Sequence, residues 1–314
     1  MTDPRFIHLR FHSEYSITDG IVRVDPMIHA VEKSGGVAIG ICDLMNIFGG
    51  LRFYTHALAA GIKPILGCDL RVMNPKDLKK PYRLGVYSMN HEGYHSLCVL
   101  LTKAFLTKND AARGLIDPAW FDNGGGKGLI CLSGASQGEL GQLLLSKRWA
   151  LAEEALERYK AWFPDCFYVE LQRAGRPSDE LATARLANFA AEHRIPVVAT
   201  HPIQFLNKED FEAHEVRCSI AEGYTLQDPR RSRNFTEEQY FKSEDEMCEL
   251  FKDIPAALVN SVEIAKRCNL DGVLSKPQLP LFPTPDGMSL DDYIDKLSKE
   301  GLQKRLEFLY PDPK

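Results

Sequence analysis

The sequence predicts an α/β fold in which successive strands close into a barrel. Short apolar runs alternate with helical patterns up to about residue 206, and polar residues follow each run where a strand would end. A doubly wound open sheet would carry a glycine-rich phosphate loop after its first strand, and HSEYSITDG is not such a loop. The predicted fold is therefore a closed (β/α)7, TIM-like barrel with parallel strands.

The expected elements follow one another in regular order. Proline suits the first turn of a helix and glycine follows its end, so Asp25-Pro26 begins a helix that Gly35-Gly36 closes. Further helices are expected over residues 51–60, 93–108, 147–163 and 179–193. The expected strands are residues 7–11, 37–41, 63–72, 82–87, 128–132, 167–171 and 195–199, each short and apolar as a buried strand requires.

The alternation then stops, and a helical extension is expected from about residue 207. Ser243 and Glu246 form a capping box that begins one helix, and Pro255 begins another. The barrel with this extension is expected to fill residues 1–275. Residues 276–288 contain four prolines and are expected to form a semi-rigid linker. Residues 289–314 then form an amphipathic helix, which we interpret as the truncated start of a following domain in a longer protein.

Composition limits the possible functions. The net charge of −5 argues against a free-standing nucleic-acid binder, although the basic cluster Arg230, Arg231 and Arg233 keeps that alternative open; such a run is usually a solvated loop. No apolar run is long enough to span a bilayer and the N-terminus has no signal pattern, so a cytoplasmic protein without membrane contact is expected. Eight separate cysteines without a C-x-x-C pair indicate reduced thiols.

Polar residues from separate strand ends are expected to meet at one rim of the barrel. Histidines and carboxylates in such an arrangement are the ligands of a polynuclear metal site for phosphoester hydrolysis. Salt bridges at the rim are the structural alternative. The residues are Arg10, His12, Asp19, Asp43, Asp69, Arg83, Glu170, Arg173, His201 and Gln204.

An N-terminal motif and several C-terminal stretches carry a resemblance to known families. His12-Ser13 to Asp19-Gly20 resembles the first motif of the polymerase and histidinol phosphatase (PHP) family, whose fold is a distorted seven-stranded barrel with three metal ions. HEVRCSIAEGYTL, YFKSEDEMCELFKDIPAALVNSVEIAKRCNL and the proline-rich exit resemble the N-terminal region of the alpha subunit of bacterial DNA polymerase III, the replicative polymerase. This resemblance covers essentially the whole chain.

The resemblance also implies a degenerate, vestigial metal pocket. His12, Asp19 and Asp69 match ligand positions of the family, with Asp69 one carbon shorter than the usual glutamate. The other positions have changed: Arg10 replaces the first histidine of His-x-His, Leu44 the histidine after Asp43, Arg83 a later histidine, Ala135 a cysteine, and Pro202 and Gln204 the final Asp-x-His pair.

Arg10 is the strongest argument against a metal. A guanidinium about 4 Å from a divalent ion repels it by about 8 kcal/mol at an effective dielectric of 20, and arginine cannot lose its proton. We therefore expect no metal and no catalytic residue, with Arg10 and Arg83 neutralising Asp19 and Asp69. His12, Asp19 and Asp69 stay weak candidates for one ion. His8 and His201 are candidate replacement ligands, although each is more simply a hydrogen-bonding residue.

The resemblance implies a non-catalytic PHP domain that stabilises the polymerase subunit and docks the proofreading exonuclease subunit. The remaining alpha-subunit domains, and DNA through the full-length protein, are further expected partners. The alternative is an active phosphoesterase or 3′–5′ exonuclease that uses Zn or Mn. The parent polymerase is a nucleotidyltransferase that uses Mg, but the chain has no aspartate set such as PDxDxDF, so the fragment alone is expected to be inactive.

Overall fold

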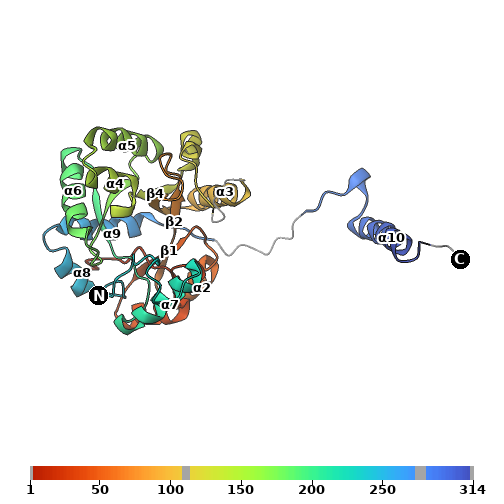
Figure 1. The fold of residues 1–314 in the computed structure, drawn as a ribbon, viewed down its shortest axis with the longest axis horizontal. Helices are drawn as coiled ribbons and strands as arrows, with labels where there is room; N and C mark the ends of the chain where they lie inside the picture. Colours follow the sequence, from red (N-terminus) through yellow and green to blue (C-terminus); the bar gives the residue numbers. More distant parts are fainter. Residues whose placement is uncertain (1–2, 108–113, 273–280, 312–314) are drawn as a thin grey trace. The chain divides into compact units, whose positions relative to one another are not determined.

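The computed structural model describes residues 3–107, 114–272 and 281–311 and divides the chain into two units, residues 1–273 and 274–314 (Figure 1). Four expectations fall partly or wholly outside the described residues: residue 108 at the end of a predicted helix, the domain end at 275, the first part of the linker, 276–280, and the last residues of the following domain, 312–314. Each unit is described by itself.

A six-stranded sheet forms the centre of the first unit, and neighbours in the sheet are also neighbours in the chain. This order is the one that successive strand–helix units produce, so the predicted α/β barrel class is confirmed. The strands are β1 (Ala38–Leu44), β2 (Lys63–Val72), β3 (Tyr82–Ser88), β4 (Leu129–Leu132), β5 (Phe167–Gln172) and β6 (Val197–Thr200).

The prediction that all strands are parallel was wrong for β3. This strand runs antiparallel to both β2 and β4, whereas the other pairs within the sheet are parallel. Residues 73–81 join β2 to β3 without a helix. A short connection returns the chain in the opposite direction, because a parallel neighbour needs a crossover.

The expected first strand, residues 7–11, is not a regular strand, but it pairs on both sides. The amide of Gly40 in β1 donates to His8 O at 2.8 Å, and the amide of Cys42 donates to Phe11 O at 2.9 Å. On the other side, the amide of Ile203 donates to Arg10 O at 3.0 Å. The segment therefore joins β1 to the chain just after β6, which closes the distorted barrel.

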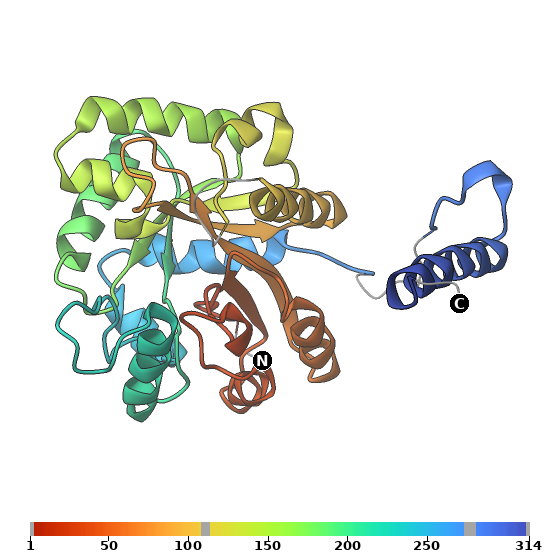
Figure 2. The same ribbon diagram turned by 45° about the vertical axis from the view of Figure 1, so that its right-hand side comes forward.

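Helices cover the outside of the curved sheet (Figures 1 and 2). The predicted helices are present to within a few residues at each end. Short helices at Glu14–Ser16, Phe121–Gly125 and Ala135–Gln137 were not predicted, and another, Lys208–Asp210, begins the expected helical extension. The longer helices are α1 (Val24–Lys33), α2 (Gly50–Ala59), α3 (His91–Leu106), α4 (Glu139–Leu145), α5 (Trp149–Trp162), α6 (Asp179–Glu192), α7 (Phe211–Glu222), α8 (Glu244–Leu250) and α9 (Pro255–Arg267).

The helical extension shares the hydrophobic core of the barrel. Met247 of α8 and Val262 of α9 belong to the same buried cluster as Leu9, Val169 and Val198. Ser261 on α9 also accepts a hydrogen bond from the amide of Ile7 at 2.9 Å. The extension is therefore part of the first unit's fold, although it is not helical throughout: residues 223–242 are irregular.

The described part of the second unit is a short turn, Pro285–Gly287, followed by helix α10 (Leu290–Leu309). Ser289 caps this helix, because its hydroxyl accepts from the amide of Asp292 at 3.1 Å. Among the helices that the structure describes, none combines the length and the apolar character that a membrane span requires.

Candidate functional site

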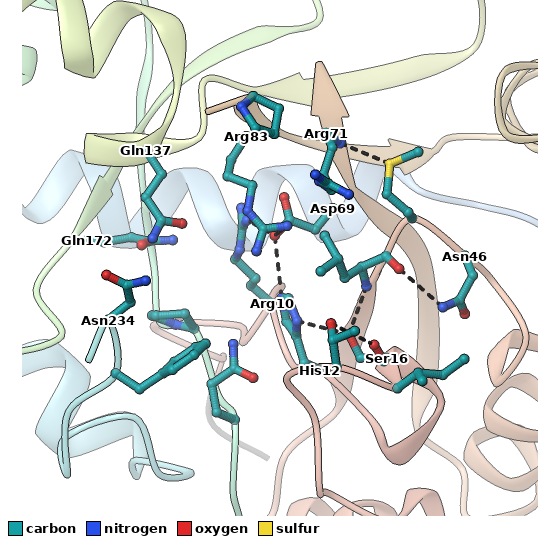
Figure 3. A pocket seen from close by; sticks show the side chains of 18 of the residues that line it. Arg10, His12, Ser16, Asn46, Asp69, Arg71, Arg83, Gln137, Gln172 and Asn234 are labelled. Atoms are coloured by element: carbon teal, nitrogen blue, oxygen red, sulfur yellow. Dashed lines mark hydrogen bonds and ion pairs between the residues drawn. The ribbon is translucent and has the colours of Figure 1, made fainter. Parts of the chain in front are cut away.

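A cavity of about 840 Å³ opens at the barrel rim where the parallel strands end (Figure 3). Asp69 lies near the end of β2, and Gln172 is the last residue of β5. In Figure 3, Gln137, Gln172 and Asn234 lie across the cavity from Asp69 and Arg71. The rim of an α/β barrel is the usual position of a functional site.

Arg10 forms the floor of this cavity between two carboxylates. Its Nη2 lies 2.6 Å from Asp69 Oδ2, and its Nη1 donates to both oxygens of Glu170 at 3.0 and 3.1 Å. The Arg10 side chain is only 4% exposed. Burial opposes its charge, but Asp69 and Glu170 keep the pKa of Arg10 well above its usual value.

Glu170 is the most completely satisfied carboxylate of the site. Besides Arg10, it accepts from the amide of Gly134 at 3.0 Å, from Gln172 Nε2 at 3.0 Å and from Thr200 Oγ1 at 2.5 Å. These donors come from separate strand ends. Glu170 therefore fixes Arg10 in place and links the ends of β4, β5 and β6 by hydrogen bonds.

His12 and Asp19 form a second group beside Arg10. His12 Nδ1 lies 3.2 Å from Asp19 Oδ1 and its Nε2 lies 3.6 Å from Asp69 Oδ2. Ser16 donates to Asp19 Oδ1 at 2.6 Å. Burial raises the pKa of Asp19, but the nearby His12 and Arg83 lower it by more. The pKa of Asp19 therefore lies below the usual range for aspartate.

Arg83 approaches both carboxylates more loosely than Arg10 does. Its Nη1 lies 3.4 Å from Asp69 Oδ2 and its Nη2 lies 3.6 Å from Asp19 Oδ2. Burial raises the pKa of Asp69, but Arg10, Arg83 and His12 hold it below its ordinary value. Arg10 and Arg83 thus both compensate the negative charge of the carboxylates in this site.

Asp43 is part of the rim but does not line the cavity. It accepts from the amide of Ser13 at 2.6 Å and from the Ser13 hydroxyl at 2.7 Å. Burial raises the pKa of Asp43 to about 6, against the lowering effect of these bonds. Asp43 therefore fixes the turn between His12 and Asp19.

The other expected rim residues divide between the cavity and its surroundings. Gln204 lines the cavity. His201 and His8 are buried outside it, and their Nε2 atoms lie 3.0 Å from Tyr240 O and 2.8 Å from Lys242 O. Arg173 points outward, where it pairs with Asp253 at 2.6 Å. These three residues fix loops of the fold. They do not join Arg10, Asp69 and Glu170, which we call the charged floor.

Several residues of the cavity were missed by the sequence reasoning. Ser16 lies in an unpredicted short helix, and Arg176 lies in the loop after β5. Gln172 could have been found, because it shares a face of β5 with Glu170, two residues before it. The remaining missed lining residues include Asn46, Arg71, Gln137 and Asn234.

Two of the three arginines in the basic cluster of the helical extension are paired with carboxylates. Arg231 is buried and forms an ion pair with Glu215 of α7, and Arg230 pairs with Asp228 at 2.7 Å. Paired arginines offer little to a phosphate backbone. This arrangement gives no support to the nucleic-acid alternative.

An α/β barrel with its charged residues gathered at the strand ends defines a class of domain in which the rim carries the function. The chain belongs to the PHP domain family, whose match covers residues 8–174. The predicted resemblance is thereby confirmed.

Relatives match nearly the whole chain. DNA polymerase III subunit alpha of Neisseria meningitidis strain Z2491 is 50% identical over 314 residues, covering 99% of this chain and 27% of that protein. The subunit of Vibrio cholerae is 44% identical over 313 residues, covering 100% of this chain and 27% of that protein. The chain spans about a quarter of the length of these relatives and matches their N-terminal region.

Solved structures share less with the chain. An amidohydrolase from Chromobacterium violaceum with bound sulfate and no metal has a TM-score of 0.45 and 11% identity, covering 67% of this chain and 96% of its own. A protein from Bifidobacterium adolescentis described as a metal-dependent phosphoesterase has a TM-score of 0.40 and 13% identity, covering 63% and 86%.

The metal ions that the PHP resemblance implies do not fit the residues present. Within the described ranges, no group of three or more histidine, cysteine or acidic side chains is arranged to hold a metal. Arg10 also contacts Asp69 Oδ2, the atom that His12 Nε2 faces. A metal at Asp69 would meet an arginine that cannot lose its charge.

Proposed function

We propose that this chain is the N-terminal PHP domain of a replicative DNA polymerase alpha subunit, and that it acts there as a non-catalytic scaffold. The observation that carries this proposal is Arg10, which is buried between Asp69 and Glu170. A guanidinium occupies the place where a hydrolytic site would need a cation that can bind and polarise a phosphoester.

The charged floor suits a structural role. Its carboxylates, Asp69 and Glu170, are buried against Arg10, a cation that the chain itself supplies. Buried ion pairs are strongly destabilising when one partner is removed. The floor is therefore expected to hold the strand ends together within the larger subunit.

The scaffold is proposed to dock the proofreading exonuclease subunit and the remaining domains of the alpha subunit in the cytoplasm, and to reach DNA only through the full-length protein. The similarity to alpha subunits over nearly the whole chain supports this context. The nucleotide-adding activity, with its Mg, would belong to the part of the relatives that the chain does not span.

The alternative function, a phosphoesterase or 3′–5′ exonuclease, is kept for one observation. His12 Nδ1 lies 3.2 Å from Asp19 Oδ1, and His12 Nε2 lies 3.6 Å from Asp69 Oδ2. The two carboxylates face opposite nitrogens of one ring, so a single Zn or Mn ion would use His12 with only one of them. Arg10 and Arg83 oppose it, because both cations contact or approach Asp69.

Hydrolysis assays test the proposal. The purified chain would be incubated with p-nitrophenyl phosphate and with single-stranded DNA, in Mn, in Zn and in EDTA. We expect rates equal to those of buffer in all three conditions. Hydrolysis that requires Mn or Zn, and that Asp69→Asn abolishes while Asp25→Asn does not, would replace the scaffold with the phosphoesterase.

A further inference from the structure

Three large apolar side chains lie around the mouth of the cavity and are exposed. The exposed fractions are 53% for Ile17, 66% for Phe48 and 54% for Phe105, and all three line the cavity. Single exposed apolar residues are ordinary, but several around one cavity are typical of a binding surface. We call Ile17, Phe48 and Phe105 the rim patch.

The backbone beside the rim patch adopts unusual conformations. Ile17 and Met45, which both line the cavity, have positive φ angles of 58° and 56°. A β-branched residue rarely adopts this region, and such residues gather at binding and switch sites. Ile17 is therefore held with its side chain at the mouth although its conformation is unfavourable.

The cavity behind the rim patch is positively charged. Its lining includes Arg10, Arg71, Lys80, Arg83 and Arg176, and Asp69 is the single lining carboxylate among the described residues. Arg10 and Arg83 are paired with Glu170, Asp69 and Asp19, so Lys80 and Arg176 carry positive charge that a ligand can use. Arg176 donates to Gln172 Oε1 at 3.2 Å and to Asn234 O at 3.4 Å. Within the described ranges, no carboxylate lies at ion-pair distance from its guanidinium. The cavity thus attracts anions on a chain whose net charge is −5.

We propose that this cavity binds a protein segment that places an apolar side chain on the rim patch and a carboxylate against Lys80 and Arg176. The inference rests on the proposed docking function, under which the partner is the exonuclease subunit. The cations of the cavity are complementary to an acidic segment. The exposed rings of Phe48 and Phe105 can pack against an apolar side chain of the partner, as in interface hot spots.

A protein segment accounts for the surface better than a nucleic acid does. Strand binding requires a basic track along the surface, whereas the nearby Arg230 and Arg231 are already paired with carboxylates. The lining cations are confined to one cavity. Its volume of about 840 Å³ suits a few side chains.

The test measures binding of the purified exonuclease subunit to the chain by fluorescence anisotropy. The apolar variant is Phe48→Asp with Phe105→Asp, and its control is Ile220→Asp on α7, where Ile220 is 70% exposed. The charge variants are Lys80→Glu alone, which alters an exposed side chain, and Lys80→Gln with Arg176→Gln. Their control is Arg230→Gln. Thermal unfolding of each variant verifies that it is folded.

We expect at least about a tenfold loss of affinity for the apolar and charge variants, and less than about a twofold change for both controls. Binding that the apolar variant leaves unchanged overturns the surface but keeps the docking function. Loss with the apolar variant alone, and none with Lys80→Glu, overturns the acidic character of the segment. No binding by the unmodified chain refutes the docking function itself.

Discussion

Arg10 and Asp69 are joined by a 2.6 Å ion pair at the floor of the barrel, and both side chains are almost fully buried. The two residues come from the segment after the N-terminus and from β2. In the metal-bound members that the sequence resembles, the position of Arg10 belongs to a histidine ligand. Under our proposal, the pair marks the exchange of a metal site for an ionic network.

Removing Arg10 is expected to destabilise the chain strongly. The substitution Arg10→Met leaves Asp69 and Glu170 buried without their main cation, and breaking a buried pair in this way costs about 3–5 kcal/mol. Urea unfolding followed by circular dichroism measures the change in the free energy of unfolding. Arg52→Met is the control, since its pair with Asp25 is exposed and should contribute at most about 1 kcal/mol. Equal losses for the two variants would remove the structural role assigned to Arg10.

Asp43→Asn is expected to change how stability depends on pH. Because burial raises the pKa of Asp43 to about 6, the folded state holds a proton that the unfolded state has already lost. The contribution of Asp43 to stability is therefore full below the unfolded pKa, near 4, and is lost as pH rises through 6. Relative to the unmodified chain, Asp43→Asn should gain about 2 kcal/mol between pH 4.5 and 7. Urea unfolding at both pH values would show no such gain if Asp43 were solvated.

His8→Gln is expected to act with the opposite sign. Burial lowers the pKa of His8 to about 4. Between about pH 6.5 and 4, His8 is therefore protonated in the unfolded chain but neutral in the folded chain. The stability that depends on neutral His8 is lost as pH falls from about 6.5 to 4. Glutamine can still donate to Lys242 O but does not titrate. Between pH 7 and 5 the unmodified chain should lose about 2 kcal/mol more than His8→Gln, as measured by urea unfolding.

Much of the fold could be predicted because apolar periodicity reports burial directly. The strands from β1 to β6 lie close to the expected runs. The direction of β3 could not be predicted, since a strand buried on both faces has the same pattern whichever way it runs. Helix α4 was missed because its seven residues, ELGQLLL, are too few to show a helical period.

The candidate site was predictable where strand ends place the side chains. Arg10, His12, Asp69 and Arg83 meet as expected from their positions on strands. Loop residues behaved differently: Arg173 turns outward to Asp253 while Arg176 lines the cavity. The loop conformation decides this, and no periodic pattern in the sequence encodes it.

The metal content of the purified chain tests the central claim most directly. The chain would be incubated with Zn and Mn, desalted, and measured by elemental analysis beside a known zinc protein treated in the same way. Since Arg10 forms ion pairs with Asp69 and Glu170, carboxylates that a metal would need as ligands, we predict far less than one ion per chain. About two or three retained ions per chain would contradict the exchange of metal for arginine.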